Sequence, residues 1–192
     1  MSQLSTKLDR RIKYTQMVLK ESFMKLLKQK PLTNITIKEL CELADINRST
    51  FYSHYKDLYD LLYQIEDGII EDMNQTLSSY NYTKNEEAIQ MTEKLLEYIV
   101  KNSESCQTLF SEHGNPTFQK KVMMLAHQHL LKSLIQDKHF IPVNIEYLSL
   151  FIANGSIHLV QHWLKNGLKE SPKEMAELMI NLATKGLSSF QQ

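Results

Sequence analysis

The chain has 192 residues, of which 42% are apolar and 23% are charged, with 22 basic and 22 acidic side chains. This composition is typical of a globular protein and excludes disordered and collagen-like classes. No apolar run reaches the roughly 18 residues of a membrane span, and the N-terminus lacks an apolar signal segment, so we expect a cytoplasmic protein without a membrane partner. Residues 1–56 carry 11 basic and 5 acidic side chains, a distribution typical of a nucleic-acid-binding module on a different kind of domain.

Apolar residues recur at spacings of three and four along nearly the whole chain, and alternating strand patterns are almost absent. This periodicity predicts an all-α protein of about nine helices. The predicted helices cover about residues 10–28, 37–44, 48–55, 58–79, 86–101, 105–111, 116–136, 145–166 and 172–188.

Several of these helices have clear start signals. Thr36 is a suitable N-cap with Glu39 three residues later, which predicts a capping box. Asn144 is the predicted N-cap of the helix that follows it. The strongest signal is Ser171 followed by Pro172, because Pro is favoured at the first position of a helix.

Two short helices joined by a three-residue turn follow a longer helix within about 50 residues. This is the outline of a helix-turn-helix DNA-binding unit. The alternative is a plain corner between two helices of a bundle. In the helix-turn-helix interpretation, the first helix contributes an inner stripe that begins at Ile12. The residues of the two short helices and their turn that are expected to face it are Leu40, Leu43, Ala44, Ile46, Phe51 and Tyr55.

The exposed part of the helix over 48–55 offers no acidic side chain, and its N-terminus would enter the major groove. Arg48 at that end suits a guanine edge. The residues expected to contact DNA are Thr36, Asn47, Arg48, Ser49, Thr50, Tyr52, Ser53, His54 and Lys56. Four of them suit phosphate oxygens, namely Thr36, Tyr52, His54 and Lys56.

The string ITIKELCELADINRSTFYSHYKDLYDLL resembles the signature of the tetracycline-repressor (TetR or AcrR) family of bacterial transcription regulators. The resemblance extends over about residues 10–62, and the matching positions are Thr36, Ile37, Leu40, Ala44, Ile46, Thr50, Phe51, Tyr52, His54 and Tyr55. It implies a homeodomain-like, three-helix DNA-binding domain over residues 1–57. It also implies a helical dimerisation and ligand-sensing domain over residues 58–192, and hence a homodimer that binds a palindromic operator.

The sequence departs from the family pattern at three positions. Asp45 stands where the family has a turn glycine, and Asp enters the left-handed region less easily than Gly. Asn47 replaces the usual capping serine and is an equivalent cap. Leu58 stands where a lysine usually contacts a phosphate, so Lys56 is the expected substitute.

The last two long helices carry apolar stripes wide enough to pack against more than their own domain. The residues expected to anchor a dimer of four such helices are Trp163, Met175, Met179 and Leu182. The alternative is that these stripes are ordinary monomer core. Segments 109–121 and 151–179 also resemble regulators of dihydroxyacetone kinase operons. That resemblance leaves open a ligand-responsive repressor or an activator controlled by a protein partner.

A small-molecule effector site is expected among the middle helices, because such pockets are mostly apolar with a few polar groups. The residues expected to line it are Tyr98, Phe110, Met123, His127, Phe151 and His158. Three of them have polar tips that are costly to bury without a partner, namely Tyr98, His127 and His158. The alternative for each residue is plain core.

No phosphate-binding loop, dinucleotide fingerprint or nucleophile elbow occurs in the sequence. His158 and His162 have metal-ligand spacing, but no carboxylate near them in sequence completes a site. We therefore expect neither an enzyme nor a metal or other cofactor. Two further alternatives are a helical interaction protein that no longer binds DNA, and an all-α enzyme that uses its histidines.

Overall fold

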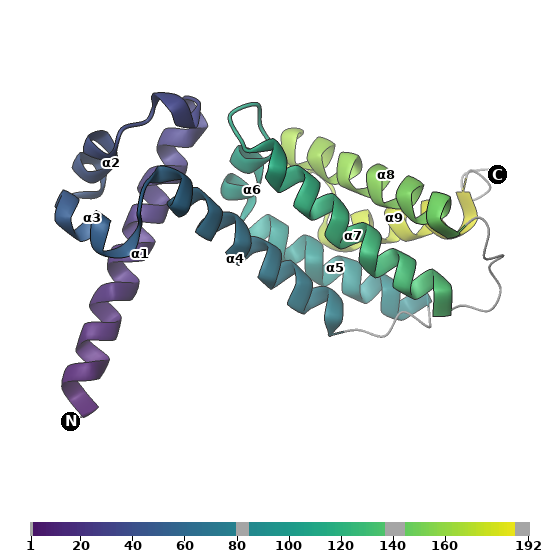
Figure 1. Ribbon diagram of the computed structural model, residues 1–192. Coiled ribbons are helices and arrows are strands. Elements are labelled where there is room, and N and C mark those ends of the chain that lie inside the picture. The colour runs from purple at the N-terminus through teal and green to yellow at the C-terminus, as the bar shows by residue number, and fades with distance from the viewer. Residues whose placement is uncertain (1, 80–84, 137–144, 187–192) are drawn as a thin grey trace. The chain divides into compact units, whose positions relative to one another are not determined.

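The computed structural model describes residues 2–79, 85–136 and 145–186, and Figure 1 shows their arrangement. Within these ranges the chain forms nine α-helices and one short 3-10 helix, without a strand, so the all-α prediction is confirmed. The elements are α1 (Ser2–Gln29), η1 (Leu32–Asn34), α2 (Ile37–Ala44), α3 (Arg48–His54), α4 (Leu58–Ser78), α5 (Asn85–Lys101), α6 (Ser103–Leu109), α7 (Pro116–Gln136), α8 (Ile145–Lys165) and α9 (Pro172–Lys185).

Most helix limits agree with the sequence-based ones to within two residues, but α1 begins at Ser2 instead of about residue 10. Residues 2–9 contain neither Gly nor Pro, so nothing in the backbone chemistry ends the helix before that point. Asn144, the expected cap of α8, and residues 187–188 of the last predicted helix lie outside the described residues.

The chain divides into two compact units. The first comprises Met1–Gly68 and Thr108–Asn115, and the second comprises Ile69–Gln107 and Pro116–Gln192. The DNA-binding domain expected over residues 1–57 lies within the first unit. That unit also includes the start of α4 and a segment from the second half of the chain.

The core of the first unit forms where α1 packs against α2, with α3 closing it. Phe23, Leu40 and Phe51 are fully buried there, and each such side chain stabilises the fold by roughly 1.5–3 kcal/mol. Two residues expected in this core are exposed: Leu43 is 50% exposed and Ile12 is 37% exposed. The apolar stripe of α2 consists of residues 37, 40, 41 and 44, and Leu43 lies outside this stripe. Ile12 precedes the part of α1 that is packed.

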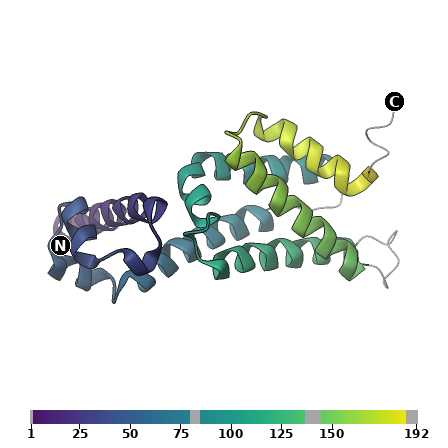
Figure 2. The same cartoon turned by 90° about the horizontal axis from the view of Figure 1, so that it is seen from above.

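In the second unit, α5 packs along α9 and α7 packs along α8, as Figure 2 shows from above. The predicted start of α9 is confirmed. The Ser171 hydroxyl accepts a hydrogen bond from the Glu174 backbone N–H at 3.3 Å, and the Glu174 carboxylate accepts one from the Ser171 N–H at 2.8 Å. Pro172 occupies the first helical position, so residues that are neighbours in sequence fix the start of α9.

Candidate nucleic-acid interface

The start of α2 is held by Thr36, whose side-chain oxygen accepts a hydrogen bond from the Glu39 backbone N–H at 3.2 Å. The Glu39 carboxylate does not complete the predicted capping box, because it pairs with the Lys30 ammonium at 2.7 Å. Because the Thr36 oxygen is the acceptor in its bond with Glu39, its hydroxyl hydrogen can donate to a phosphate oxygen. The pair between Lys30 and Glu39 also ties the end of α1 to α2.

The turn between α2 and α3 begins at Asp45, which has left-handed backbone angles (φ 52°, ψ 46°). Its N–H donates to the carbonyls of Cys41 and Glu42, and this closes the end of α2. The departure from the family glycine is thus accommodated without changing the turn. It carries a conformational cost, because an L-residue with a Cβ is disfavoured in this region.

Replacing Asp45 with glycine is expected to stabilise the protein by about 0.5–1 kcal/mol, because glycine adopts this conformation without strain. Asp45→Ala is the matched control, since it removes the same charge and keeps the Cβ. We expect the glycine variant to melt roughly 1–4 °C above the wild type and the alanine variant to melt below the glycine variant. An alanine variant at least as stable as the glycine variant would show that charge, and not backbone strain, matters at this position.

The surface of α3 presents most of the predicted DNA contacts. Asn47 occupies the predicted N-cap position of α3. Its side chain makes no capping hydrogen bond, so Asn47 caps the helix through its backbone alone. The Tyr52 ring packs edge-on against the buried ring of Phe51, with centroids 5.5 Å apart, which orients its exposed face. Exposed among the nine candidates are Thr36, Asn47, Arg48, Ser49, Tyr52, Ser53 and Lys56, whereas Thr50 and His54 are half-buried.

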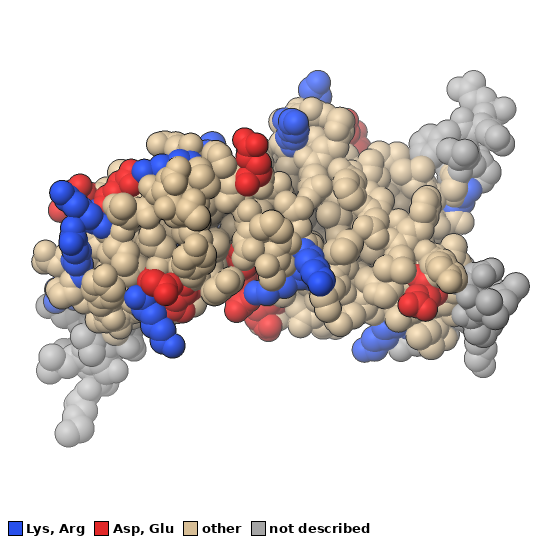
Figure 3. Space-filling view, turned by 45° about the horizontal axis from the view of Figure 1, so that its top comes forward, with Lys and Arg blue, Asp and Glu red and all other residues tan. Residues whose placement is uncertain are grey.

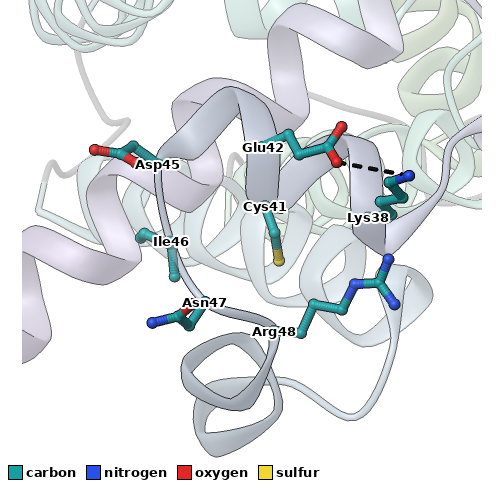
Figure 4. A pocket seen from close by; sticks show the side chains of 7 residues that line it. All are labelled: Lys38, Cys41, Glu42, Asp45, Ile46, Asn47 and Arg48. Atoms are coloured by element: carbon teal, nitrogen blue, oxygen red, sulfur yellow. Dashed lines mark ion pairs between the residues drawn. The ribbon is translucent and has the colours of Figure 1, made fainter.

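Figure 4 shows a hollow between α2 and α3 at the start of this surface. Its lining consists of Lys38, Cys41, Glu42, Asp45, Ile46, Asn47 and Arg48. Lys38 forms a 3.8 Å ion pair with Glu42, and both side chains are about two-thirds exposed. The sequence analysis did not include Lys38 or Glu42 in the site. The four-residue spacing that pairs them on one helix face was the available signal.

The thiol of Cys41 lies in this hollow but is 5% exposed. Burial raises the pKa of Cys41, and the positive charge of Arg48 opposes this only in part. The group is therefore a neutral thiol at neutral pH and acts as an apolar side chain of the core.

Lys56 lies in the connection between α3 and α4, which hydrogen bonds keep in one conformation. The backbone N–H of Lys56 donates to the Asp60 carboxylate at 2.9 Å, and the Asp60 N–H donates to Asp57 at 2.8 Å. The bond from Lys56 and one from Gln64 hold the pKa of Asp60 below its usual value. The Lys56 side chain is thus presented to solvent from a fixed backbone.

The six residues expected to line an effector pocket are not gathered into one buried set. Phe151 is 80% exposed. His158 is also exposed, and its ring Nδ1 lies 2.8 Å from the Asn154 carbonyl oxygen. The Tyr98 hydroxyl donates to Asp72 at 2.9 Å, so its polar tip is not reserved for a ligand. Met123, His127 and Phe110 are half-buried, and Phe110 belongs to the first unit.

The four expected dimer anchors differ in exposure. Trp163 is 2% exposed and donates its indole N–H to the Glu170 carbonyl at 3.1 Å, and Met175 is 5% exposed. Both are therefore core of a single chain, the alternative that the sequence left open. Met179 and Leu182 on α9 are half-buried. The residues of α8 with large exposed apolar side chains are Tyr147, Leu148, Leu150 and Phe151.

Among the residues that the structure describes, no group of three or more His, Cys, Asp or Glu side chains is placed to hold a metal ion. His162 instead lies 2.6 Å from the Asn166 amide nitrogen. No helix in the described ranges is both long and apolar enough to cross a bilayer.

Comparison with known proteins identifies a family. Residues 86–185, just over half of the chain, match a TetR-type model described as a transcriptional regulator C-terminal region. An uncharacterised helix-turn-helix transcriptional regulator of Bacillus subtilis, YxbF, is 24% identical over 176 residues, which is 86% of this chain. The chain spans 44% of the length of that curated relative.

Solved structures show the same fold. A TetR transcriptional regulator from Streptococcus agalactiae is 21% identical with a TM-score of 0.67, over 93% of this chain and 98% of its own. The dihydroxyacetone kinase operon activator DhaS is 18% identical with a TM-score of 0.63, over the same shares. Both the sequence model and the fold therefore lead to one conclusion: the chain belongs to the TetR family of transcriptional regulators, which are not enzymes.

Proposed function

We propose that this regulator binds double-stranded operator DNA through α3, the start of α2 and the connection to α4. The observation that carries the proposal is the outer surface of α3, which exposes Arg48, Ser49, Tyr52 and Ser53 without a carboxylate, while Phe51 on the opposite side is fully buried. A short helix packed in this way is fixed in orientation and offers donors to base edges.

The candidate contacts divide into two kinds. Arg48 at the first position of α3 donates to a guanine edge, because its planar group forms two parallel hydrogen bonds there. Thr36, Tyr52 and Lys56 donate to phosphate oxygens and set the position of α3 without reading sequence. Asn47, Ser49, Thr50, Ser53 and His54 complete the proposed interface.

Replacing Lys56 with alanine is expected to weaken binding to every duplex alike and to reduce the slope of log K against log salt by about 0.9 per subunit, since one phosphate contact is lost. The measurement is a salt titration of binding to operator and mixed-sequence DNA. Lys101→Ala is the control, because this exposed lysine of α5 has the same charge and lies in the second unit. An unchanged slope for Lys56→Ala would remove Lys56 from the phosphate set.

We further propose a homodimer formed through α8 and α9, which would bind a palindromic operator. Tyr147 and Phe151 are one helical turn apart on α8 and are 74% and 80% exposed. Apolar groups this exposed are usual where a partner covers them. Met179 and Leu182 on α9 are half-buried and so can still contact a partner, whereas Trp163 cannot.

Effector control is the last part of the proposal. We propose a ligand-responsive repressor whose site includes His127, because its Nε2 atom is buried without a hydrogen-bond partner in the described structure. An activator controlled by a protein partner is the second candidate, and the similarity to the operon activator DhaS is the observation that favours it. Transcription assays with and without the regulator give opposite signs for the two candidates.

The decisive experiment for DNA binding is selection of duplexes from a random pool by the purified protein. We expect enrichment of a palindrome with two half-sites about one helical turn apart, as a symmetric dimer requires. Recovery of an unenriched pool would overturn operator binding. Enrichment of one unrepeated half-site would retain DNA binding and overturn the dimer.

A further inference from the structure

The positive charge of the N-terminal region lies in α1 and the loop after it, outside the two helices proposed to face DNA. Residues 1–35 contain eight basic and two acidic side chains, whereas residues 36–56 contain three of each. Sequence-independent affinity for DNA comes from Lys and Arg side chains that neutralise phosphates. Residues 36–56 have no net charge, and Lys56 is the one cation among them that is assigned to a phosphate above. Further cations are therefore expected from elsewhere in the first unit.

Three cations stand close together near the start of α1. Arg10, Arg11 and Lys13 are all exposed, and no acidic residue occurs between residues 10 and 17. Along a helix these positions span only about 4.5 Å. None of the three is in an ion pair with another described residue. Figure 3 shows blue Lys and Arg atoms interspersed with red Asp and Glu atoms on one face of the molecule.

Arg10 and Lys13 share an exposed face of α1, and Arg11 lies at the edge of this face, about 100° around the helix from Arg10. Arg10, Lys13, Tyr14 and Met17 follow the spacing i, i+3, i+4, i+7, so they lie on one side of α1, opposite the stripe that contains the buried Leu19. Tyr14 is 63% exposed and Met17 is 47% exposed. Figure 1 shows the N-terminal turns of α1 extending beyond α2 and α3. In the part of the chain that the structure describes, this face is exposed, and its charge is complementary to DNA.

We propose that this α1 basic face, defined by Arg10, Arg11, Lys13 and Tyr14, binds the phosphate backbone of the same duplex that α3 reads. The three cations neutralise neighbouring phosphates, and the Tyr14 hydroxyl donates a hydrogen bond to one of them. These contacts add affinity and salt dependence for every base sequence alike. The proposal rests on the DNA binding proposed above and adds a second contact region to it.

The experiment compares three versions of the full chain on a mixed-sequence duplex several helical turns long, with salt varied between about 50 and 200 mM. The variant Arg10→Ala/Arg11→Ala/Lys13→Ala removes the basic face. The control Lys165→Ala/Lys169→Ala/Lys173→Ala removes three exposed charges from the second unit. We expect the first variant to lower the slope of log K against log salt by about 2.7 per subunit, so that its affinity falls about 40-fold less per subunit than that of the wild type between about 50 and 200 mM salt. The control is expected to keep the wild-type slope.

The outcomes separate this proposal from the proposed function. A wild type that binds DNA with an Arg48-dependent preference, together with an unchanged slope for the α1 variant, overturns the α1 contact alone. Equal losses in the α1 variant and the control also overturn it, because total charge would then be the cause. Binding of the wild type to vesicles rich in phosphatidylglycerol, lost in the α1 variant while DNA affinity is retained, would assign the face to a membrane surface. A wild type that binds no duplex overturns both proposals.

The charge-conserving variant Arg10→Lys/Arg11→Lys checks that folding is not the cause of any loss. It is expected to keep the wild-type salt slope, because phosphates are contacted by charge and not by base-specific geometry. Helix content measured by circular dichroism should be the same in all versions, since residues 10–13 are exposed. A loss of DNA affinity in the lysine variant equal to that of the alanine variant contradicts a charge-based contact.

Discussion

Replacing Arg48 with alanine is expected to weaken binding to the selected operator by roughly 5- to 150-fold per subunit while leaving binding to mixed-sequence DNA nearly unchanged. The reason is that a bidentate contact from arginine to guanine contributes about 1–3 kcal/mol of discrimination at one base pair. Arg48 is exposed at the first position of α3, and its backbone is set by the Asp45 turn and the buried Phe51. The measurement is the ratio of operator to mixed-sequence affinity at one salt concentration.

Arg48→Lys is the informative companion to this variant. Lysine keeps the charge and loses the two-pronged geometry, so it should retain mixed-sequence binding and recover only part of the operator preference. The operator position whose preference relaxes in Arg48→Ala identifies the base that this side chain reads. Equal weakening of operator and mixed-sequence DNA by Arg48→Ala would instead assign Arg48 to a phosphate.

The second large effect is expected from Phe151→Glu, which should convert the proposed dimer to a monomer. Phe151 is 80% exposed in the single chain, so the substitution leaves the fold of each subunit intact. In a dimer through α8 the same carboxylate would be buried against an apolar partner, at a cost of several kcal/mol. Sedimentation velocity at several protein concentrations measures the outcome. Operator affinity should fall with it, because a monomer binds only one half-site.

The matched control for Phe151→Glu is Met124→Glu, which places the same charge on α7 at a residue that is 50% exposed. We expect this variant to stay dimeric. If Met124→Glu dissociates and Phe151→Glu does not, the interface lies on α7 and the proposed α8 contact is wrong. A monomeric wild type that still binds a palindrome would show that pairing occurs only on DNA.

Features that depend on a few neighbouring residues were predictable from the sequence. The number of helices, the turn at Asp45 and the capping box at Ser171 follow from apolar spacing and from residues whose backbone and side-chain preferences act locally. The helix-turn-helix was recognisable because its core and its turn lie within one short segment. The family resemblance drawn from those residues was confirmed by the match to residues 86–185.

Only the tertiary structure decided which partner covers each apolar face. A helical stripe reports that a face is apolar, but it does not tell whether a neighbour in the same chain or another molecule packs on it. Trp163 was expected against a second subunit and is instead buried by its own chain, whereas Phe151 was expected inside a pocket and is exposed. Ile12 likewise continues the apolar stripe of α1 and is nevertheless 37% exposed, because burial depends on which elements meet in space and not on periodicity alone.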